Sequence, residues 1–313
     1  MVIDPVRRSP TRSRRDFIKA GAATLAARRL TAAAPGMYVS LNSSLTGGKV
    51  AWPEFARLAA RTGFGGVDVN LAAAMKEGAE ATRALFGELN ITASNVNLPV
   101  TFSRDEPAFQ TGLAKLGEAA AFCDSIGCPT MLGILPPSSP SPKTELRKLV
   151  KDRLTAIGEV LLRSKIRLGL EFLGPLHFRT AQPHAFIWRM DDALEFAKEC
   201  GPNIGLLLDV WHWQHAGATT SDIQAAGAAR IVHVHLSDCP KLPAEQVRDN
   251  QRVLPGEGVI DLAGFFQALK KIGYRNGVSP EPIGRIPKEM SAEEGARLGL
   301  ETALAVMRKA GVA

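Results

Sequence analysis

The chain has 313 residues, of which 45% are hydrophobic and 22% are charged, a composition typical of a globular protein. No apolar run approaches the ~20 residues that span a bilayer, so we expect no membrane span. The formal charge of +7 is concentrated in residues 1–30, which carry eight basic and two acidic side chains, and the rest of the chain carries 30 basic and 29 acidic ones. Because a nearly neutral body lacks the electrostatic pattern of a nucleic-acid-binding protein, we expect no nucleic-acid partner.

The first 34 residues have the organisation of an export signal. The string Ser13-Arg-Arg-Asp-Phe-Ile-Lys19 precedes a mildly apolar stretch over 20–27, and Ala32-Ala-Ala34 offers a small-residue cleavage site. This arrangement resembles a twin-arginine signal, so we expect the twin-arginine export machinery as a partner and a periplasmic or secreted location. A basic tail on a cytoplasmic protein is the alternative, and Arg28-Arg29 inside the apolar stretch favours it.

Eight short runs rich in Ile, Leu and Val are predicted to be strands, and amphipathic helical patterns separate most of them. One such pattern, over 262–272, follows Asp261 as a candidate N-cap and precedes Gly273. The alternation predicts a single-domain (β/α)8 TIM barrel over residues 37–313. A doubly wound open sheet is the alternative, but the sequence lacks the glycine-rich phosphate motifs of that fold. The predicted strands are Tyr38–Asn42, Gly65–Leu71, Ile91–Leu98, Thr130–Leu135, Ile166–Phe172, Ile204–Val210, Ile231–Asp238 and Gly277–Ile283.

Four of these strands, all in the second half, end in side chains that bind hard metal ions. They are Glu171, Asp209, His235 and Glu281. The carboxyl ends of parallel barrel strands converge on one face, where polar residues are more often catalytic than structural. Three carboxylates are costly to bury together unless a cation neutralises them. We therefore predict a divalent metal site, with Mn²⁺ favoured and Mg²⁺, Co²⁺ or Zn²⁺ as alternatives.

Each of these residues alone also has an ordinary structural interpretation. Glu171 could pair with an arginine, Asp209 could cap the next turn, His235 could be a satisfied core histidine, and Glu281 could lie on the surface between two prolines. If the protein bound no metal, each of the four residues would need its own structural role, and all four would occur at consecutive strand ends by coincidence. The four cysteines show no paired C-x-x-C spacing, so we expect buried free thiols rather than a thiolate zinc site.

The order of these residues carries a family resemblance. Glu171, Asp209-x-x-His212, His235-x-x-Asp238 and Glu281 resemble the xylose-isomerase-like superfamily of sugar isomerases and epimerases. The run 254–262, Leu-Pro-Gly-Glu-Gly-Val-Ile-Asp-Leu, is similar to that family as well, and the resemblance covers roughly residues 37–310. It implies that the four strand-end residues bind a metal and that His212 contacts the substrate.

Three positions depart from the pattern that the resemblance implies. His177 lies six residues after Glu171, where a second acidic or basic contact is usual. Lys241 lies six residues after His235, where an arginine is usual. Asp68 ends a Gly-Gly-Val-Asp run where these proteins often have Gly-x-x-Glu. The departures bear on which substrate is bound rather than on metal binding.

The resemblance implies a divalent-metal-dependent sugar isomerase or epimerase. We expect Glu171 and Glu281 to move a proton next to a metal-polarised carbonyl of a keto- or hydroxy-sugar. The candidate substrate-binding residues are His177, His212, Lys241 and Arg252, the last in the long loop before the final helical pattern. If the protein is exported, an unphosphorylated sugar or a cyclitol is the expected substrate.

Three other functions compete with this expectation. A metal-dependent lyase or dehydratase on a keto-sugar or cyclitol would use the same residues. A non-catalytic sugar-binding protein would not need both carboxylates placed for acid–base work. A phosphodiesterase acting on abasic DNA shares the barrel of this superfamily, but its metal cluster needs more histidines than the six present and a basic groove.

Overall fold

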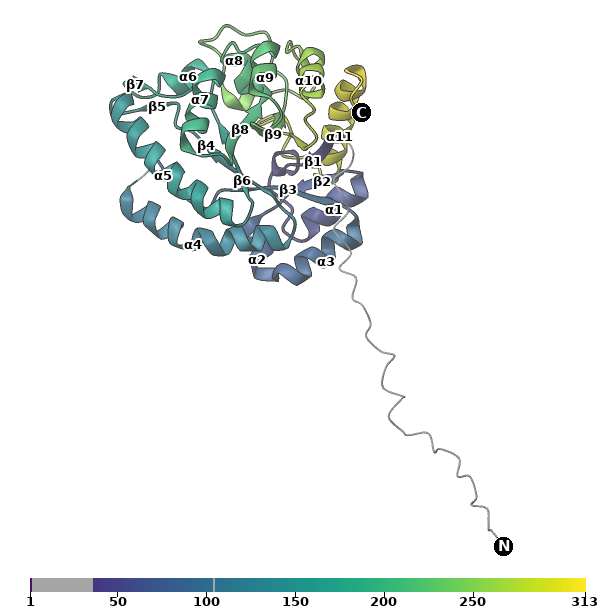
Figure 1. Cartoon of the computed structure of the whole chain (residues 1–313). Coiled ribbons are helices and arrows are strands. Elements are labelled where there is room, and N and C mark those ends of the chain that lie inside the picture. The colour runs from purple at the N-terminus through teal and green to yellow at the C-terminus, as the bar shows by residue number, and fades with distance from the viewer. Residues whose placement is uncertain (2–35, 104) are drawn as a thin grey trace. The chain divides into compact units, whose positions relative to one another are not determined.

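The computed structural model describes Met1, residues 36–103 and residues 105–313; the predicted export signal therefore lies outside the described residues, apart from Met1. The centre of the fold is a closed barrel of eight parallel strands, ordered β1-β10-β9-β8-β6-β4-β3-β2 and surrounded by helices (Figure 1). This architecture confirms the predicted TIM barrel. The barrel strands are β1 (Tyr38–Leu41), β2 (Gly66–Asp68), β3 (Thr92–Asn97), β4 (Thr130–Ile134), β6 (Arg167–Glu171), β8 (Ile204–Asp209), β9 (Ile231–Leu236) and β10 (Gly277–Pro280).

The helices begin where the sequence places capping residues. Asp261, the predicted N-cap, accepts a hydrogen bond of 2.9 Å from the backbone N–H of Gly264 at the start of α10, which satisfies one of the free amides of the first turn. Ser291 and Glu294 form a capping box at the start of the last helix. The helices are α1 (Glu54–Thr62), α2 (Leu71–Glu77), α3 (Ala79–Leu89), α4 (Glu106–Ser125), α5 (Lys143–Arg163), α6 (Leu176–Arg179), α7 (Met190–Cys200), α8 (Val210–His215), α9 (Thr220–Ala226), α10 (Leu262–Lys271) and α11 (Ala292–Lys309).

The strands differ from the predicted ranges mainly at their carboxyl ends. Strand β2 ends at Asp68 instead of Leu71, because the Asn70 side chain accepts from the Ala73 N–H at 3.1 Å and so begins α2. A two-stranded antiparallel ladder of β5 (Ser138–Ser139) and β7 (His184–Ala185) lies outside the barrel and was not predicted. Two residues per strand are too few to produce a periodic sequence pattern.

The strand register determines which side chains meet at the mouth of the barrel. Asp209 on β8 pairs with His235 on β9, and His235 pairs with Ser279 on β10. The backbone N–H of Glu281 donates to the Leu236 carbonyl at 2.7 Å, so Glu281 follows directly on this layer. The end of β6 completes the layer with Glu171. Neighbouring strands therefore deliver the four candidate ligands to one rim.

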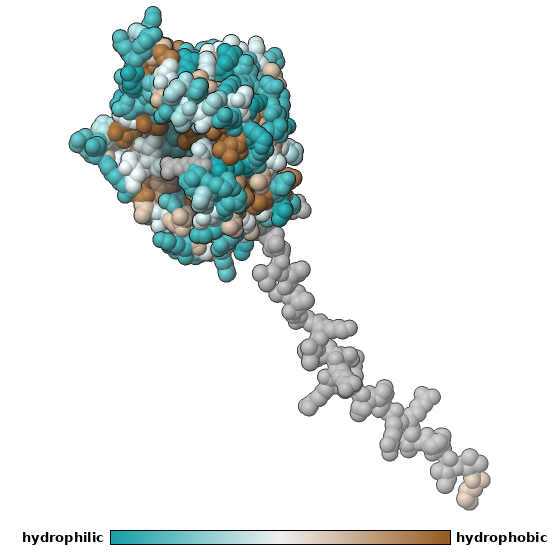
Figure 2. Space-filling model, turned by 90° about the vertical axis from the view of Figure 1, so that its left-hand side faces the viewer, coloured by the Kyte–Doolittle hydropathy of each residue, from teal (hydrophilic) through white to brown (hydrophobic). Residues whose placement is uncertain are grey.

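The state of the cysteines and the polarity of the helices agree with what the sequence predicts. All four cysteines are buried free thiols, as expected. In the part of the chain that the structure describes, no helix has the length and apolar content needed to cross a membrane. On the face drawn in Figure 2, hydrophobic residues form scattered patches around a hollow instead of one continuous area.

Candidate metal centre

The four candidate ligands converge at the carboxyl ends of β6, β8, β9 and β10. One donor atom from each of Glu171, Asp209, His235 and Glu281 lies within 4.8 Å of the others. Ligands on opposite sides of a small divalent ion are separated by about twice the metal–ligand distance, or ~4 Å. Asp209 is fully buried, and Glu171 and His235 are less than a tenth exposed. The four side chains are thus already spaced so that small adjustments would complete a coordination shell.

Buried donor atoms in the cluster lack hydrogen-bond partners. Both ring nitrogens of His235 and one carboxylate oxygen of Glu171, Oε1, are buried and unpaired. Native structures leave few buried polar atoms unsatisfied, and a missing ion is one explanation for those that are. Carboxylate oxygens with one imidazole form a donor set that suits Mn²⁺, Mg²⁺, Co²⁺ or Zn²⁺. The residues present therefore fit a divalent ion.

A buried arginine partly balances the acidic cluster. The Nη1 of Arg252 donates to Asp209 Oδ2 at 2.6 Å and to Glu281 Oε2 at 3.0 Å, and the residue is only 3% exposed. Among the candidate ligands and Arg252 alone, three carboxylates and one guanidinium leave two negative charges, which a divalent cation would cancel. Arg252 also pairs with Asp249 at 2.8 Å, outside this set. Burial alone would lower the pKa of Arg252, but Asp209 and Glu281 outweigh that effect and raise it.

The two glutamates have opposite pKa shifts in the metal-free protein. Burial raises the pKa of Glu171 to about 7, because the nearby His235 only partly offsets the loss of water. Burial also opposes ionisation of Glu281, but His235 and Arg252 outweigh it and lower the pKa of Glu281 to about 2. The same carboxylates raise the pKa of His235 well above its ordinary value, against the effect of burial. Glu281 is closer than Glu171 to His235 Nδ1, and it also contacts Arg252.

The amino-acid sequence matches a known family over most of its length. Residues 56–307 match the family model described as Xylose isomerase-like TIM barrel. The chain belongs to the xylose isomerase-like TIM barrel family.

Individual relatives in the family are moderately similar. An inosose isomerase of Halalkalibacterium halodurans is 30% identical over 168 residues, which are 53% of this chain; the match spans only 57% of that protein's length. A solved Xylose Isomerase domain protein from Alicyclobacillus acidocaldarius is 29% identical, with a TM-score of 0.81 over 88% of this chain and 99% of that one. The structure of the IolI protein with a bound zinc atom is 23% identical, with a TM-score of 0.75 over 87% and 99% of the two chains.

Arg252 is the predicted substrate-binding residue that contacts the carboxylate cluster directly. His212 is the predicted residue that lies beside Arg252. It is buried on α8, and its Nε2 lies 3.2 Å from Nη2 of Arg252. Because a guanidinium only donates, His212 Nε2 accepts, and the ring proton is on Nδ1. Burial lowers the pKa of His212 to about 3, so the ring is neutral. Its Nδ1–H is buried without a hydrogen-bond partner.

The predicted substrate-binding residues His177 and Lys241 are not part of the carboxylate cluster. Arg252, not Lys241, is the basic residue that the structure brings to the xylose isomerase-like site. Lys241 is exposed in the loop after β9, because that loop continues for ten more residues before the chain returns to the rim. His177 is half-buried on α6, stacked against Phe178 with ring centroids 4.1 Å apart.

A buried carboxylate outside the metal cluster, Asp238, organises the loop after β9; it is not among the predicted site residues. Asp238 accepts hydrogen bonds from the backbone amides of Cys239, Gly256, Gly258 and Ile260, all between 2.8 and 3.1 Å. A two-way backbone bridge also joins Asp238 to Val253. These bonds hold both ends of the loop and fix the place of Arg252. The His-x-x-Asp spacing contains Asp238, but spacing alone does not reveal such a role.

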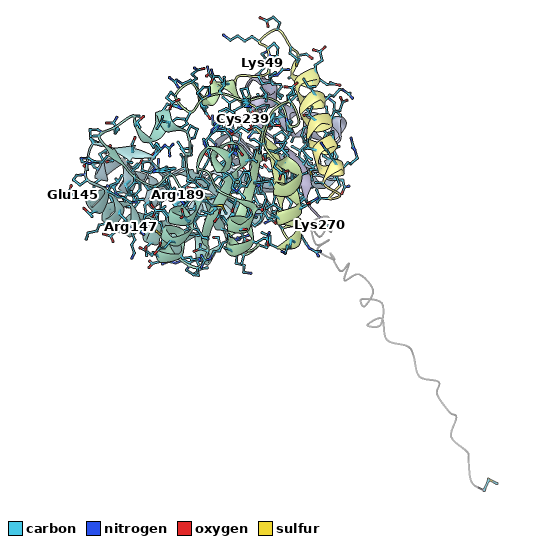
Figure 3. All side chains as sticks on the ribbon, turned by 90° about the horizontal axis from the view of Figure 1, so that it is seen from above. Lys49, Glu145, Arg147, Arg189, Cys239 and Lys270 are labelled. Atoms are coloured by element: carbon cyan, nitrogen blue, oxygen red, sulfur yellow. The ribbon has the colours of Figure 1, made fainter. Side chains whose placement is uncertain are left out.

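A cavity of about 750 Å³ adjoins the metal cluster on the side of β1, β2 and β3. His235 and Glu281 form its inner end. No lysine or arginine is among the described residues that line it. Lys49, which is near the edge of the molecule in Figure 3, directs its ammonium to the carbonyl oxygens of Lys288 and Met290. Asp68, His235 and Glu281 are the titratable side chains of the lining. Its other polar side chains are neutral amides and hydroxyls: Asn42, Ser43, Ser44, Asn70, Asn95 and Asn97.

Proposed function

We propose that this protein is a divalent-metal-dependent isomerase or epimerase of unphosphorylated keto-sugars or cyclitols. The observation that carries the proposal is the convergence of Glu171, Asp209, His235 and Glu281 on one rim, with their donor atoms within 4.8 Å. The similarity to inosose isomerase supports the isomerase class and a cyclitol-like substrate. The zinc atom in the IolI structure, which has the same fold, shows that this fold is compatible with a bound divalent ion. We favour Mn²⁺ because three of the four donors are carboxylates.

The proton transfer is assigned to the two glutamates. A divalent ion would supply Lewis acidity toward the carbonyl oxygen of the substrate. Glu281 is the more accessible of the pair, with 18% of its side chain exposed, and it lines the cavity. We assign to Glu281 the removal of the proton from the carbon next to the carbonyl. A proton that Glu171 takes up from solvent and gives to the opposite face would invert that carbon, whereas return of the proton held by Glu281 to the neighbouring carbon would isomerise the sugar.

His212 and Arg252 are assigned to the developing negative charge. The unpaired Nδ1–H of His212 is a neutral donor, and the Arg252 guanidinium is fixed by Asp209 and Glu281. Fixed donors in a buried site stabilise a charged intermediate more than solvent does, because they need no reorganisation. The charged intermediate is the enediolate that forms when the proton is removed. In a dehydratase this enediolate would lose a β-hydroxyl, so product analysis distinguishes the two activities.

The cavity supports an uncharged substrate. Amide and hydroxyl side chains can donate to and accept from hydroxyl groups, whereas phosphate recognition usually uses arginine, lysine or helix N-termini. The lining has the neutral groups and no basic side chain among its described residues. An unphosphorylated substrate also agrees with export to the periplasm by the twin-arginine route, which we retain as a proposal from the residues before Pro35.

Deuterium exchange tests the assignment of Glu281. Glu281→Gln is expected to reduce solvent-deuterium incorporation into an inosose or a free ketohexose by roughly 10²–10⁴-fold at saturating Mn²⁺, measured by NMR. Glu245→Gln, an exposed change in the loop after β9, is the matched control and should exchange like the wild type. Retained exchange in the Glu281 variant would refute the proton-transfer role. Elemental analysis of metal-loaded wild-type protein tests the ion itself.

A further inference from the structure

Another carboxylate lies behind the metal centre, on the opposite wall of the barrel. Asp68, at the end of β2, accepts four side-chain hydrogen bonds from residues on or next to three other strands. The donors are Ser40 (2.8 Å), Asn42 (2.9 Å), Asn95 (2.8 Å) and Ser279 (2.8 Å). Three of these bonds end on Oδ1, and only that of Asn42 ends on Oδ2. The carboxylate is therefore held firmly, and Oδ2 keeps room for a further donor.

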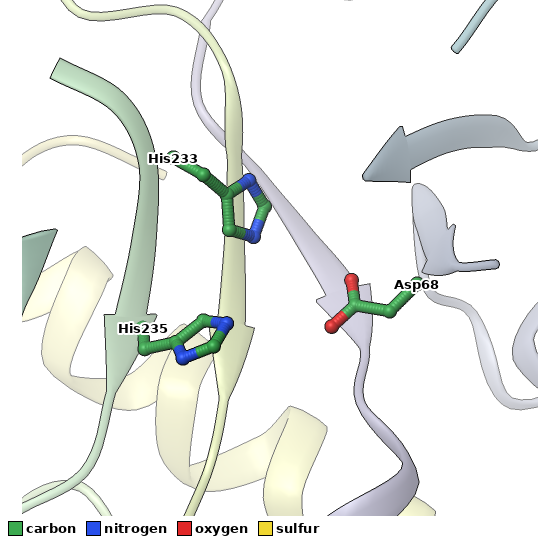
Figure 4. A group of neighbouring side chains, drawn as sticks. All are labelled: Asp68, His233 and His235. Atoms are coloured by element: carbon green, nitrogen blue, oxygen red, sulfur yellow. The ribbon is translucent and has the colours of Figure 1, made fainter. Parts of the chain in front are cut away.

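The two nitrogens of His235 face different neighbours. Nδ1 lies 3.2 Å from Glu281 Oε2 and 3.6 Å from Glu171 Oε1, so Nδ1 faces the metal position. Nε2 is buried and has no hydrogen-bond partner. Figure 4 shows one ring nitrogen of His235 turned toward the Asp68 carboxylate, and donor atoms of the two residues lie within 4.8 Å. If Nδ1 binds the ion, Nε2 carries the ring proton and needs an acceptor.

A second metal ion does not account for this group. His233 lies in the same cluster, but its Nε2 is 2.7 Å from the Ser279 hydroxyl, which itself donates to Asp68. The same Nε2 is 3.1 Å from the amide nitrogen of Asn95, so two polar neighbours already occupy it and it has no free position for a metal. Oδ1 of Asp68 is also already occupied by three donors. The group is a hydrogen-bond network.

We infer that Asp68 is a positioning residue that accepts the Nε2–H of His235, directly or through one water, and so fixes the ligand for the metal. This inference rests on the metal site of the proposed function. Carboxylates that hold a metal-binding histidine fix its tautomer and raise its basicity, and their loss typically weakens metal affinity about 10–100-fold. Strand β2 would thereby act on an ion bound by the other half of the barrel.

Metal titration of the apoprotein tests the inference. Asp68→Asn is expected to weaken Mn²⁺ binding about 10–100-fold, measured by EPR of the free ion. Ser40→Ala is the matched control, because it removes one donor of the same network that bonds to Asp68 and to neither histidine. Its Mn²⁺ affinity should stay within about threefold of the wild type. Circular dichroism establishes that both variants are folded.

A second measurement uses only the wild-type protein. In Zn²⁺-loaded protein with ¹⁵N-labelled histidine, His235 should be protonated on Nε2 with a strongly deshielded proton, as in a hydrogen bond to a carboxylate. Protonation on Nδ1 would overturn the inference, as would unchanged Mn²⁺ affinity in Asp68→Asn or an equal loss in Ser40→Ala. Failure of the wild type to bind any ion would instead overturn the proposed function, so the two failures are distinguishable.

Discussion

The two sides of the barrel mouth differ sharply in chemistry. The side formed by β6, β8, β9 and β10 gathers three carboxylates, a histidine and a buried arginine. Apart from the Asp68 carboxylate, the side formed by β1, β2 and β3 presents amides, hydroxyls and the apolar side chains of Trp52 and Phe55 around a cavity. Charged groups can hold an ion and move protons, whereas neutral ones can only recognise shape and hydroxyl groups. We infer from this contrast that one side of the barrel mouth carries out the reaction and the other side selects the substrate.

Removing the arginine should give the largest effect on the charged side. Arg252→Met leaves Asp209 and Glu281 buried without their cation, and breaking such a pair typically costs about 3–5 kcal/mol. We expect that loss in the free energy of unfolding of the metal-free protein, measured with urea. Because the variant site is more negative, added Mn²⁺ should stabilise it more than it stabilises the wild type.

Lys241→Met is the control for this prediction. Lys241 is exposed and belongs to the same loop, so its replacement should change neither stability nor the response to Mn²⁺. Equal effects of the two substitutions would mean that the guanidinium is not the counter-ion of the cluster.

The pH dependence of metal uptake should be the next largest effect. In the metal-free protein the pKa of Glu171 is about 7 and that of His235 is raised well above its ordinary value. Both groups must be deprotonated to bind an ion, so the affinity should fall as the pH drops through 7. The number of protons released per ion should rise by about one as the pH is lowered from 8 to 6, because Glu171 becomes protonated in the metal-free protein over that range. Calorimetry in buffers of different ionisation enthalpy measures this number, and release of no protons would contradict the ligand assignment.

Substitutions on the neutral side of the barrel mouth should have smaller effects on activity. Asn97 is exposed on the cavity lining and is not a member of the metal cluster. Loss of one hydrogen bond of about 0.5–1.5 kcal/mol in Asn97→Ala should raise KM by roughly 2–10-fold, with kcat and Mn²⁺ affinity unchanged. A large fall in kcat, measured by steady-state kinetics, would mean that the two sides are not separate in function.

The charged side could be predicted from the sequence because its signals are local. Each ligand directly follows a buried apolar run, as in Ile204–Asp209, and strand parity places it on the rim. The fold followed from the same runs. These inferences needed no knowledge of loop conformation.

Other parts of the site depend on contacts between distant segments. Lys241 has the expected spacing from His235, but counting along the chain assumes a fixed loop length, and the longer loop brings Arg252 to the rim instead. The network around Asp68 uses serines and asparagines from separate strands, whose sequence context looks ordinary. No periodic pattern identifies which of many such residues will meet across a barrel.

The anchoring of the loop by Asp238 has a consequence for protein engineering. Its bonds to Gly256, Gly258 and Ile260, together with the bridge to Val253, tie down both ends of the segment. Residues 240–248 span the interval between these ties, so transplanting a segment of another length there should leave the guanidinium where it is. Residues 240–248 could then be exchanged to bind new substrates while the barrel and its metal site remain unchanged.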